Sequence, residues 1–398
     1  MTLSRNHRVT YVGRTTFRNA GVLFGIRKRD RLAHSYVVGK TGTGKSTLLN
    51  TMAAQDVAAG NGFALFDPHG DLAEKVAALA AVRRAKDLIY LNVPEADLPW
   101  TFNPFARIPA DKRALAAAGM VEVFKKLWPD DWGPRLEHLL RNVVFTLLES
   151  PGASFADIPP LLTNRDYRDQ LLASVTNDVV RDFWQTEYAR YSPAFRAVVV
   201  APLQNKLGAL LTDPILRRIL TDERAQLDLR RLMDEGRILI VNLDKGRIGE
   251  GPASLLGSLL VSHLSLAGLS RSNLLEEERR DFLIYLDEFQ LFGTQSLANM
   301  LSELRKYRVG MVLAHQHLSQ LDPVVRDAVF GNVGTMMAFR LGAEDAVFLA
   351  REFAPTFTFT DLTGLPRFNL YLRLLIDGET TKPFSAVTLS SLDEVPGF

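Results

Sequence analysis

The sequence of 398 residues contains no cysteine. Disulfide bonds, thiolate metal sites and cysteine nucleophiles are therefore excluded, which fits a protein of a reducing compartment. The sequence also lacks a strong charge imbalance, because 47 lysines and arginines face 45 acidic residues. Net charge alone therefore does not argue for a nucleic-acid partner, and the pI of about 8.7 does not argue against one.

Long uninterrupted apolar runs are missing as well. The first ten residues, MTLSRNHRVT, do not contain the apolar core of a signal peptide. The longest apolar stretch, residues 254–269, is broken by glycine, serine and histidine, so we expect it to be too short and too polar to span a bilayer. We therefore expect no intrinsic membrane segment and a cytoplasmic location. A composition of 47% hydrophobic and 23% charged residues allows a large buried core in one or two domains.

The sequence does contain a glycine-rich loop between an apolar strand and a helical pattern. Residues 39–46, GKTGTGKS, have Walker A spacing in the strand–loop–helix context that this motif requires. The glycines let the backbone turn with positive φ, and the following helix N-terminus directs N–H groups at an anion. We expect Lys45 to reach the β- and γ-phosphates and Ser46 to ligate Mg²⁺. The predicted nucleotide-binding residues are Gly39, Thr41, Gly42, Thr43, Gly44, Lys45, Ser46 and Thr47.

A second motif lies far along the chain, at residues 282–288, FLIYLDE. An apolar strand that ends in two acids is the pattern of a Walker B strand with an added glutamate. We predict that Asp287 holds Mg²⁺ and that Glu288 polarises the attacking water. The strand GMVLA that follows leads to Gln316, which is placed to sense the γ-phosphate.

Four predicted strands thus end at Gly39, Asp67, Asp287 and Gln316. Ligands bind at the carboxyl ends of strands in parallel α/β sheets, so we expect one site there. If the first two strands are neighbours, Asp67 lies beside the glycine-rich loop and contributes to the Mg²⁺ shell. His69 either stabilises its loop or takes part in function.

The pattern of apolar and polar residues changes after residue 107. From 108 to 235, amphipathic helices punctuated by proline and glycine replace the β-rich runs, which indicates an inserted all-α domain. Residues 1–107 and 236–398 then form an α/β core with a mostly parallel sheet. Within this core we predict a small β segment at 8–26 and a C-terminal β-hairpin around Asp377 and Gly378.

For two groups of residues the sequence leaves two interpretations open. The basic run of Arg27, Lys28, Arg29 and Arg31 is either a solvated surface or the source of one arginine that reaches a phosphate. The aromatic residues of the helical segment, Trp184 among them, either pack in its core or stack on bases.

The segments GKTGTGKST, FDPHGD, FNPF, FLIYLDEFQ, LRKYRVGMVLAHQ and MAFRLGAEDA occur in that order, with the helical insert in the middle. Together they resemble the FtsK/HerA superfamily of ring-shaped DNA-pumping ATPases, and most of all the conjugative coupling proteins of type IV secretion (TraD- and TrwB-like). The resemblance implies a RecA-like P-loop core, a homo-hexamer, ATP and Mg²⁺ as cofactors, and single- or double-stranded DNA as a partner. It also implies that Lys45, Ser46, Asp287, Glu288 and Gln316 form the nucleotide site.

The same resemblance implies that Arg305 and Arg340 complete the site of a neighbouring subunit. For Arg340, an intrachain ion pair with Glu344 or Asp345 is the alternative.

The implied function is ATP-driven DNA translocation, with a secretion or relaxase-type partner and an inner-membrane location reached through partners. Coupling proteins usually begin with a transmembrane pair, and this sequence shows none. The other functions considered are a secretion-type ATPase that acts on protein and a nucleotide switch, and Glu288 argues against the switch because it supplies a base.

Overall fold

The structure is a computed structural model that describes residues 9–17, 19–95, 99–222 and 225–398. The chain forms two compact units. The first contains residues 1–92, 230–244 and 271–398, and the second contains residues 93–229 and 245–270. The predicted insert, 108–235, falls mostly in the second unit, which also takes in residues 93–107 and helix α12 (Glu250–Ser270). Helix α12 belongs there because it packs against helix α3 (Arg113–Leu127).

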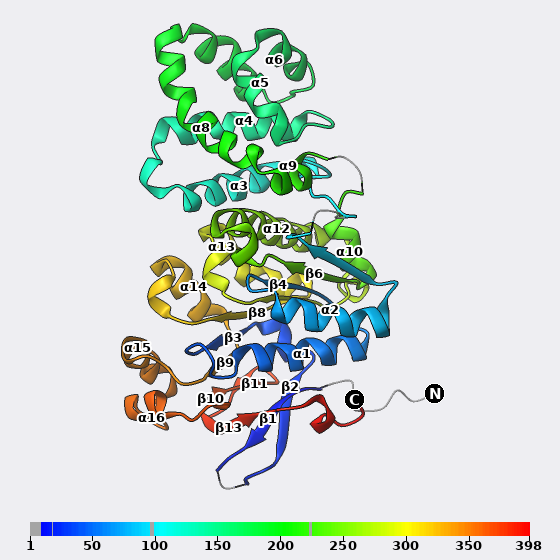
Figure 1. Cartoon of the computed structure of the whole chain (residues 1–398), viewed down its shortest axis with the longest axis vertical. Helices are drawn as coiled ribbons and strands as arrows, with labels where there is room; N and C mark the ends of the chain where they lie inside the picture. Colours follow the sequence, from blue (N-terminus) through cyan, green and yellow to red (C-terminus); the bar gives the residue numbers. More distant parts are fainter. Residues whose placement is uncertain (1–8, 18, 96–98, 223–224) are drawn as a thin grey trace. The chain divides into compact units, whose positions relative to one another are not determined.

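A sheet of eleven strands forms the centre of the first unit (Figure 1). The strands are β1 Val9–Thr15, β2 Leu23–Arg27, β3 Ser35–Val38, β4 Gly62–Asp67, β5 Leu88–Asn92, β6 Ile238–Asn242, β7 Phe282–Leu286, β8 Val309–His315, β9 Thr335–Ala338, β10 Asn369–Arg373 and β13 Phe384–Thr388. Their order is β2-β1-β13-β10-β9-β3-β8-β7-β4-β6-β5. Every pairing from β9 to β5 is parallel, and every pairing from β2 to β9 is antiparallel. The predicted α/β class with a mostly parallel sheet is confirmed.

Two helices of the first unit, α1 and α2, pack side by side against one face of this sheet (Figure 1). Leu48 and Met52 of α1 and Val76 of α2 are buried in one apolar cluster with Leu65 and Val312 of the strands. Burying such side chains contributes about 1.5–3 kcal/mol each to folding. The helices of this unit are α1 Lys45–Ala59, α2 Asp71–Arg84, α10 Leu229–Glu235, α13 Gln295–Leu304, α14 Pro323–Asn332, α15 Ala343–Phe353 and α16 Phe359–Gly364.

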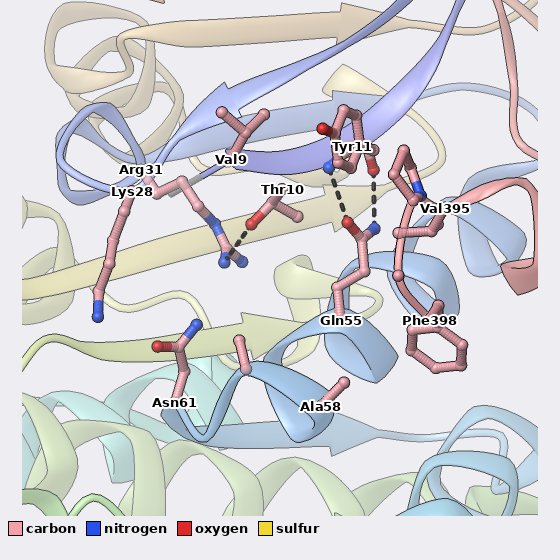
Figure 2. A pocket seen from close by; sticks show the side chains of 13 residues that line it. Val9, Thr10, Tyr11, Lys28, Arg31, Gln55, Ala58, Asn61, Val395 and Phe398 are labelled. Atoms are coloured by element: carbon pink, nitrogen blue, oxygen red, sulfur yellow. Dashed lines mark hydrogen bonds between the residues drawn. The ribbon is translucent and has the colours of Figure 1, made fainter. Parts of the chain in front are cut away.

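The predicted N-terminal strand pair is confirmed, but it extends the sheet, because β1 pairs with β13. Gln55 of α1 also holds β1, since its amide accepts from Tyr11 N (2.8 Å) and donates to Tyr11 O (2.9 Å) (Figure 2).

The predicted C-terminal hairpin is confirmed too. It consists of β10 and β13, with the short ladder β11 Leu375–Ile376 and β12 Glu379–Thr380 at its tip. Asp377 and Gly378 both have positive φ, as a tight two-residue turn requires.

The second unit is mainly helical. Its helices are α3 Arg113–Leu127, α4 Pro134–Glu149, α5 Ile158–Thr163, α6 Arg165–Leu172, α7 Asp178–Asp182, α8 Pro193–Thr212, α9 Pro214–Thr221, α11 Lys245–Ile248 and α12 Glu250–Ser270. The segment Glu250–Asn273 is long and apolar enough to cross a membrane, with a mean hydropathy of 1.5. The sequence-based statement that this stretch is too short and too polar is therefore wrong. Of its most apolar window, 89% is buried inside the protein, as in the core helix of a folded domain.

Candidate nucleotide site

The strand register brings the predicted polar strand ends to one edge of the sheet. Val38 pairs with His315, Leu313 pairs with Leu286, and Leu286 pairs with Phe66. The residues that follow β3, β8 and β7, together with the last residue of β4, therefore share this edge. Strands β3 and β4 are not neighbours, however, since β8 and β7 lie between them. Asp67 consequently lies beside the β7 end. Its placement beside the glycine-rich loop depended on β3 and β4 being neighbours, and this condition is not met.

The glycine-rich loop connects β3 to α1 in a conformation that L-residues rarely adopt. Gly42 and Gly44 have φ of 74° and 129°. A Cβ on Gly44 would approach the rings of Phe339 and Phe368 to 2.9 and 3.0 Å, so this glycine is required for packing as well as for its φ. The Thr43 hydroxyl donates to Lys40 O (2.7 Å). The loop is thus held in place by its own contacts, and α1 begins at its end.

Lys45, the first residue of α1, lies inside the loop and is only 6% exposed. Its Nζ donates to the carbonyl oxygens of Gly39 and Lys40. Burial lowers the pKa of Lys45, while the carboxylates of Glu288 and Asp287 oppose this change. The ammonium group is therefore positioned between the loop backbone and the acids that end β7. The Ser46 side chain, one residue further along α1, is exposed.

Asp287 follows β7 directly and is 4% exposed. Burial raises its pKa to about 7, and the nearby carboxylates of Asp67 and Glu288 add to this effect. Three acids in a buried place are unfavourable without a cation, so the site fits Mg²⁺ on electrostatic grounds. The described residues contain no group of three or more His, Cys, Asp and Glu side chains arranged to hold a metal. Mg²⁺ is usually bound by one or two carboxylates together with phosphate oxygens, which agrees with Asp287 as its protein carboxylate ligand here.

Glu288 has a left-handed backbone conformation, with φ of 49°, and is 4% exposed. Gln316 Nε2 donates to its Oε1 (2.5 Å), Gln290 Nε2 donates to its Oε2 (2.6 Å), and His69 Nε2 lies 3.8 Å from Oε1. Burial alone would raise the pKa of Glu288, but these three side chains and Lys45 lower it to about 2. The carboxylate is therefore ionised and held in one orientation.

Gln316 connects the two motifs. Besides its bond to Glu288, its Oε1 accepts from the Thr41 hydroxyl of the glycine-rich loop (2.6 Å). Gln290 was not assigned to the site by sequence reasoning, whereas His69 was left with a role either in its loop or in function. Gln290 follows the Walker B pair by two residues within FLIYLDEFQ, and this spacing is the only signal that could have indicated it.

Asp67 has a structural role in this arrangement. Its carboxylate accepts from the backbone N–H groups of His69 (2.8 Å), Leu72 (2.9 Å) and Ala73 (2.9 Å). It therefore caps the start of α2, as acidic side chains commonly do at helix N-termini. These bonds show that Asp67 serves as a helix cap. A direct contribution of Asp67 to a Mg²⁺ shell stays a prediction.

The two predicted arginines, Arg340 and Arg305, lie at opposite ends of the parallel strands. Arg340 follows β9, and its carbonyl oxygen accepts from Lys40 N in the glycine-rich loop (3.0 Å). Its side chain is exposed, and within the described residues it forms no ion pair with Glu344 or Asp345. Arg305 begins a 3₁₀ turn before β8, at the amino end of that strand, and is also exposed. Arg340 thus lies beside the loop of its own chain, whereas Arg305 is far from it along the strands.

Comparison with solved structures places this geometry in a known fold. The plasmid coupling protein TrwB in complex with the non-hydrolysable ATP analogue ADPNP matches this structure with a TM-score of 0.68. The two chains are 19% identical, and the match covers 98% of this chain and 91% of that one. TrwB in complex with ADP and Mg²⁺ has a TM-score of 0.65 at 18% identity, over 98% of this chain and 96% of that one. At these identities the likeness establishes the α/β P-loop fold.

Comparison of sequences gives the family. The chain is 24% identical over 377 residues to the type 4 coupling protein DotL of Legionella pneumophila, which covers 78% of this chain and 47% of DotL. The chain thus spans about half the length of that relative. The family model for the DNA-binding domain of type IV secretion-system coupling proteins matches residues 18–345, which is most of the chain. The chain therefore belongs to the type IV secretion-system coupling proteins.

Proposed function

We propose that this chain is a Mg²⁺-dependent ATPase that translocates DNA, acting as the motor part of a coupling protein. The observation that carries the proposal is the link from the Walker A loop through Gln316 to the ionised Glu288. A nucleotide held by the loop would lie against an ionised carboxylate that can orient a water molecule. TrwB has been solved with an ATP analogue and with ADP and Mg²⁺, which supports the same ligands for this chain.

In this proposal the loop residues bind the phosphates. The backbone N–H groups from Gly39 to Thr47 surround the phosphate oxygens at the α1 N-terminus, and Lys45 neutralises the β- and γ-phosphates. Ser46 and Asp287 would hold Mg²⁺, which would supply charge neutralisation between the β- and γ-phosphate oxygens. Lys45 exchanges its contacts with loop carbonyls for the phosphates, because a phosphate offers it a full negative charge.

Glu288 is the proposed general base. With all its donors in place its pKa of about 2 makes it a weak base. Gln316 is the proposed γ-phosphate sensor, and a phosphate oxygen would compete with Glu288 for its amide. Moving that amide removes one of the donors that lower the pKa of Glu288, so nucleotide binding would also make the base stronger. Gln290 keeps the carboxylate oriented while this happens.

The proposed assembly is a homo-hexamer in which arginines complete the site of the adjacent subunit. Arg340 and Arg305 are the candidates. Because they lie at opposite ends of the strands, an experiment can tell which of the two acts on the adjacent subunit. The first compact unit would be the motor core and the second the inserted helical domain. The proposed partners are DNA and a secretion or relaxase-type protein, and the chain would reach the inner membrane through such partners.

The decisive experiment measures DNA-stimulated ATP hydrolysis for the wild type, Lys45→Ala and Glu288→Gln. We expect DNA to raise the wild-type rate, Lys45→Ala to lose nucleotide binding, and Glu288→Gln to bind ATP but hydrolyse it about 10²–10⁴-fold more slowly. A Glu288→Gln protein that hydrolyses ATP at the wild-type rate would refute the assignment of the base. Wild-type hydrolysis that does not respond to DNA would refute DNA translocation and leave the ATPase assignment intact.

A further inference from the structure

A pocket of about 710 Å³ lies within the second unit, among α6, α7 and the start of α8. Four arginines line it, and Asp169 is the one carboxylate among the residues that line it. The arginines are Arg165, Arg168, Arg181 and Arg196. This concentration of positive charge contrasts with the whole sequence, whose basic and acidic residues nearly balance.

Two of these arginines have carboxylate partners and two do not. Arg165 lies 3.7 Å from Asp169, and Arg181 pairs with Asp178. Neither Arg168 nor Arg196 has an acidic side chain within ion-pair distance in the part of the chain that the structure describes. The pocket therefore contains two guanidinium groups that form no ion pair with a described residue, and Asp169 is the one lining carboxylate to offset the charge of four arginines.

Both of these groups rest on a rigid aromatic surface. The guanidinium carbons of Arg168 and Arg196 each lie 5.1 Å from the ring centre of Tyr188, and that of Arg168 lies 5.8 Å from Trp184. Tyr188 is fixed by a bond from its hydroxyl to Leu162 O (2.7 Å). Trp184 Nε1 is likewise bound, donating to a threonine hydroxyl at 2.8 Å. The positive charges are thus positioned before any ligand arrives.

The two arginines also retain unused hydrogen-bonding capacity. A guanidinium carries five N–H donors, and Arg168, which is 6% exposed, uses Nη1 to donate to Leu161 O (3.0 Å). Arg196 reaches the carbonyl oxygens of Tyr188 and Tyr191 only at 3.4 and 3.5 Å, and its buried Nε has no partner among the described residues. Burial lowers the pKa of Arg168, and the charges of Arg196 and Arg165 lower it further, while Tyr188 and Asp169 oppose this change. Such an arrangement is unfavourable unless an anion shares it.

We propose that this pocket binds a phosphate group, at a site separate from the nucleotide loop. A carboxylate offers two oxygens, which one arginine fork can satisfy, whereas a phosphate offers more oxygens and more charge to several guanidinium groups. The volume is within the range of ligand pockets and admits the organic part that carries the phosphate. That phosphate comes either from a small organic phosphate or from the backbone of DNA.

Calorimetric titration of the full chain tests this site. All proteins carry Lys45→Ala, so that binding at the nucleotide loop is weakened, and the probes are inorganic pyrophosphate and a short single-stranded oligonucleotide. Arg196→Gln and Arg168→Gln remove the unpaired charges. Arg190→Gln is the matched control, because Arg190 is exposed, lies on the same stretch of chain and does not line the pocket. We expect the first two variants to bind at least one probe about 10- to 150-fold more weakly, as for the loss of one charged hydrogen bond, and the control to bind normally.

The pattern of losses identifies the source of the phosphate. A loss with pyrophosphate supports a small organic phosphate, and a loss with the oligonucleotide alone supports the DNA backbone. Unchanged binding of both probes by Arg196→Gln overturns the proposal. The proposal is also overturned if a poly-glutamate peptide binds more tightly than pyrophosphate and loses this affinity in the Arg196→Gln variant. Arg168 is buried, so if Arg168→Gln fails to fold, as judged by circular dichroism, Arg196→Gln and Arg165→Gln decide the question.

Discussion

Replacing Asp56 with alanine is expected to destabilise the first unit by about 3–5 kcal/mol, because it leaves a buried arginine without its countercharge. Arg31 and Asp56 are 2% and 0% exposed. Arg31 Nη1 and Nη2 donate to the two Asp56 oxygens at 2.6 and 2.9 Å. Figure 2 shows the further bond from Arg31 Nη1 to the Thr10 hydroxyl, at 2.8 Å. Tyr285 completes the group, since its hydroxyl accepts from Arg31 and donates to Asp56. Burial alone would lower the pKa of Arg31, but Asp56 and Tyr285 raise it above its usual value.

The size of the effect can be resolved by comparing substitutions. Tyr285→Phe removes the one hydroxyl that contacts both charged groups, but Arg31 and Asp56 remain paired with each other. The expected loss is therefore that of a single hydrogen bond to a charged group, about 1.5–3 kcal/mol. The double substitution Arg31→Met with Asp56→Leu removes both charges and is expected to cost less than Asp56→Ala alone. Lys28→Met is the control, because Lys28 is exposed and lies 3.7 Å from Asp281, so it should change stability by no more than about 0.5 kcal/mol.

Thermal unfolding followed by circular dichroism and by calorimetry measures these differences. A loss of 3–5 kcal/mol corresponds to a fall in Tm of about 6–20 °C for a cooperative unit of 150–250 residues. Calorimetry is needed because two compact units can melt in separate transitions, and only the transition of the first unit should move. If Asp56→Ala shifts that transition no more than Lys28→Met does, the pair does not stabilise the fold. If the double substitution costs more than Asp56→Ala, the network does not act through the uncompensated charge.

Three further outcomes are expected. Mixing Lys45→Ala protein with either Arg340→Ala or Arg305→Ala protein should restore ATPase activity only for the arginine that acts across the subunit interface; an arginine that serves its own chain gives no restoration in mixed rings. DNA affinity should fall steeply between 50 and 200 mM salt, as it does for proteins that contact phosphates, and binding that does not respond to salt would exclude a backbone-tracking motor. Asp67→Ala should cost about 0.5–2 kcal/mol through loss of the α2 cap, measured by denaturant unfolding, while Asp71→Ala, one residue past the cap, should cost less.

The sequence was sufficient to predict the parts of the site that depend on local pattern. The length and polarity of the segment around Lys45 indicate a strand, a loop and a helix, and those of the segment before Asp287 indicate a buried strand. The structure has these elements. The prediction that these strands end at one edge followed from the behaviour of parallel sheets. His263, the histidine within the apolar stretch 254–269, is a core histidine whose two ring nitrogens contact the carbonyl oxygens of Leu259 and Pro104, both at 2.8 Å.

What the sequence could not supply was the order of strands and the partners of charged residues. Asp67 would lie beside the glycine-rich loop only if β3 and β4 were neighbours, but β8 and β7, which come later in the chain, insert between them. Arg31 belongs to a basic run that was expected either to be solvated or to supply an arginine to a phosphate, yet Arg31 is buried against Asp56. In both cases the deciding contact joins residues that only the folded sheet brings together, and no spacing rule reports such a contact.

The same limit explains why Gln290 was overlooked and what its position means. Glu288 was identified by type and place, but its chemistry depends on which donors surround it. In the structure two amides hold its two oxygens, and one of those amides, from Gln316, also contacts Thr41 of the glycine-rich loop. A base held this way is ionised but weak. In the proposed motor, hydrolysis therefore requires Gln316 to leave Glu288, and only the nucleotide that enters the loop offers that amide a better acceptor. The strength of the base then depends on the presence of the substrate, because one side chain contacts both motifs.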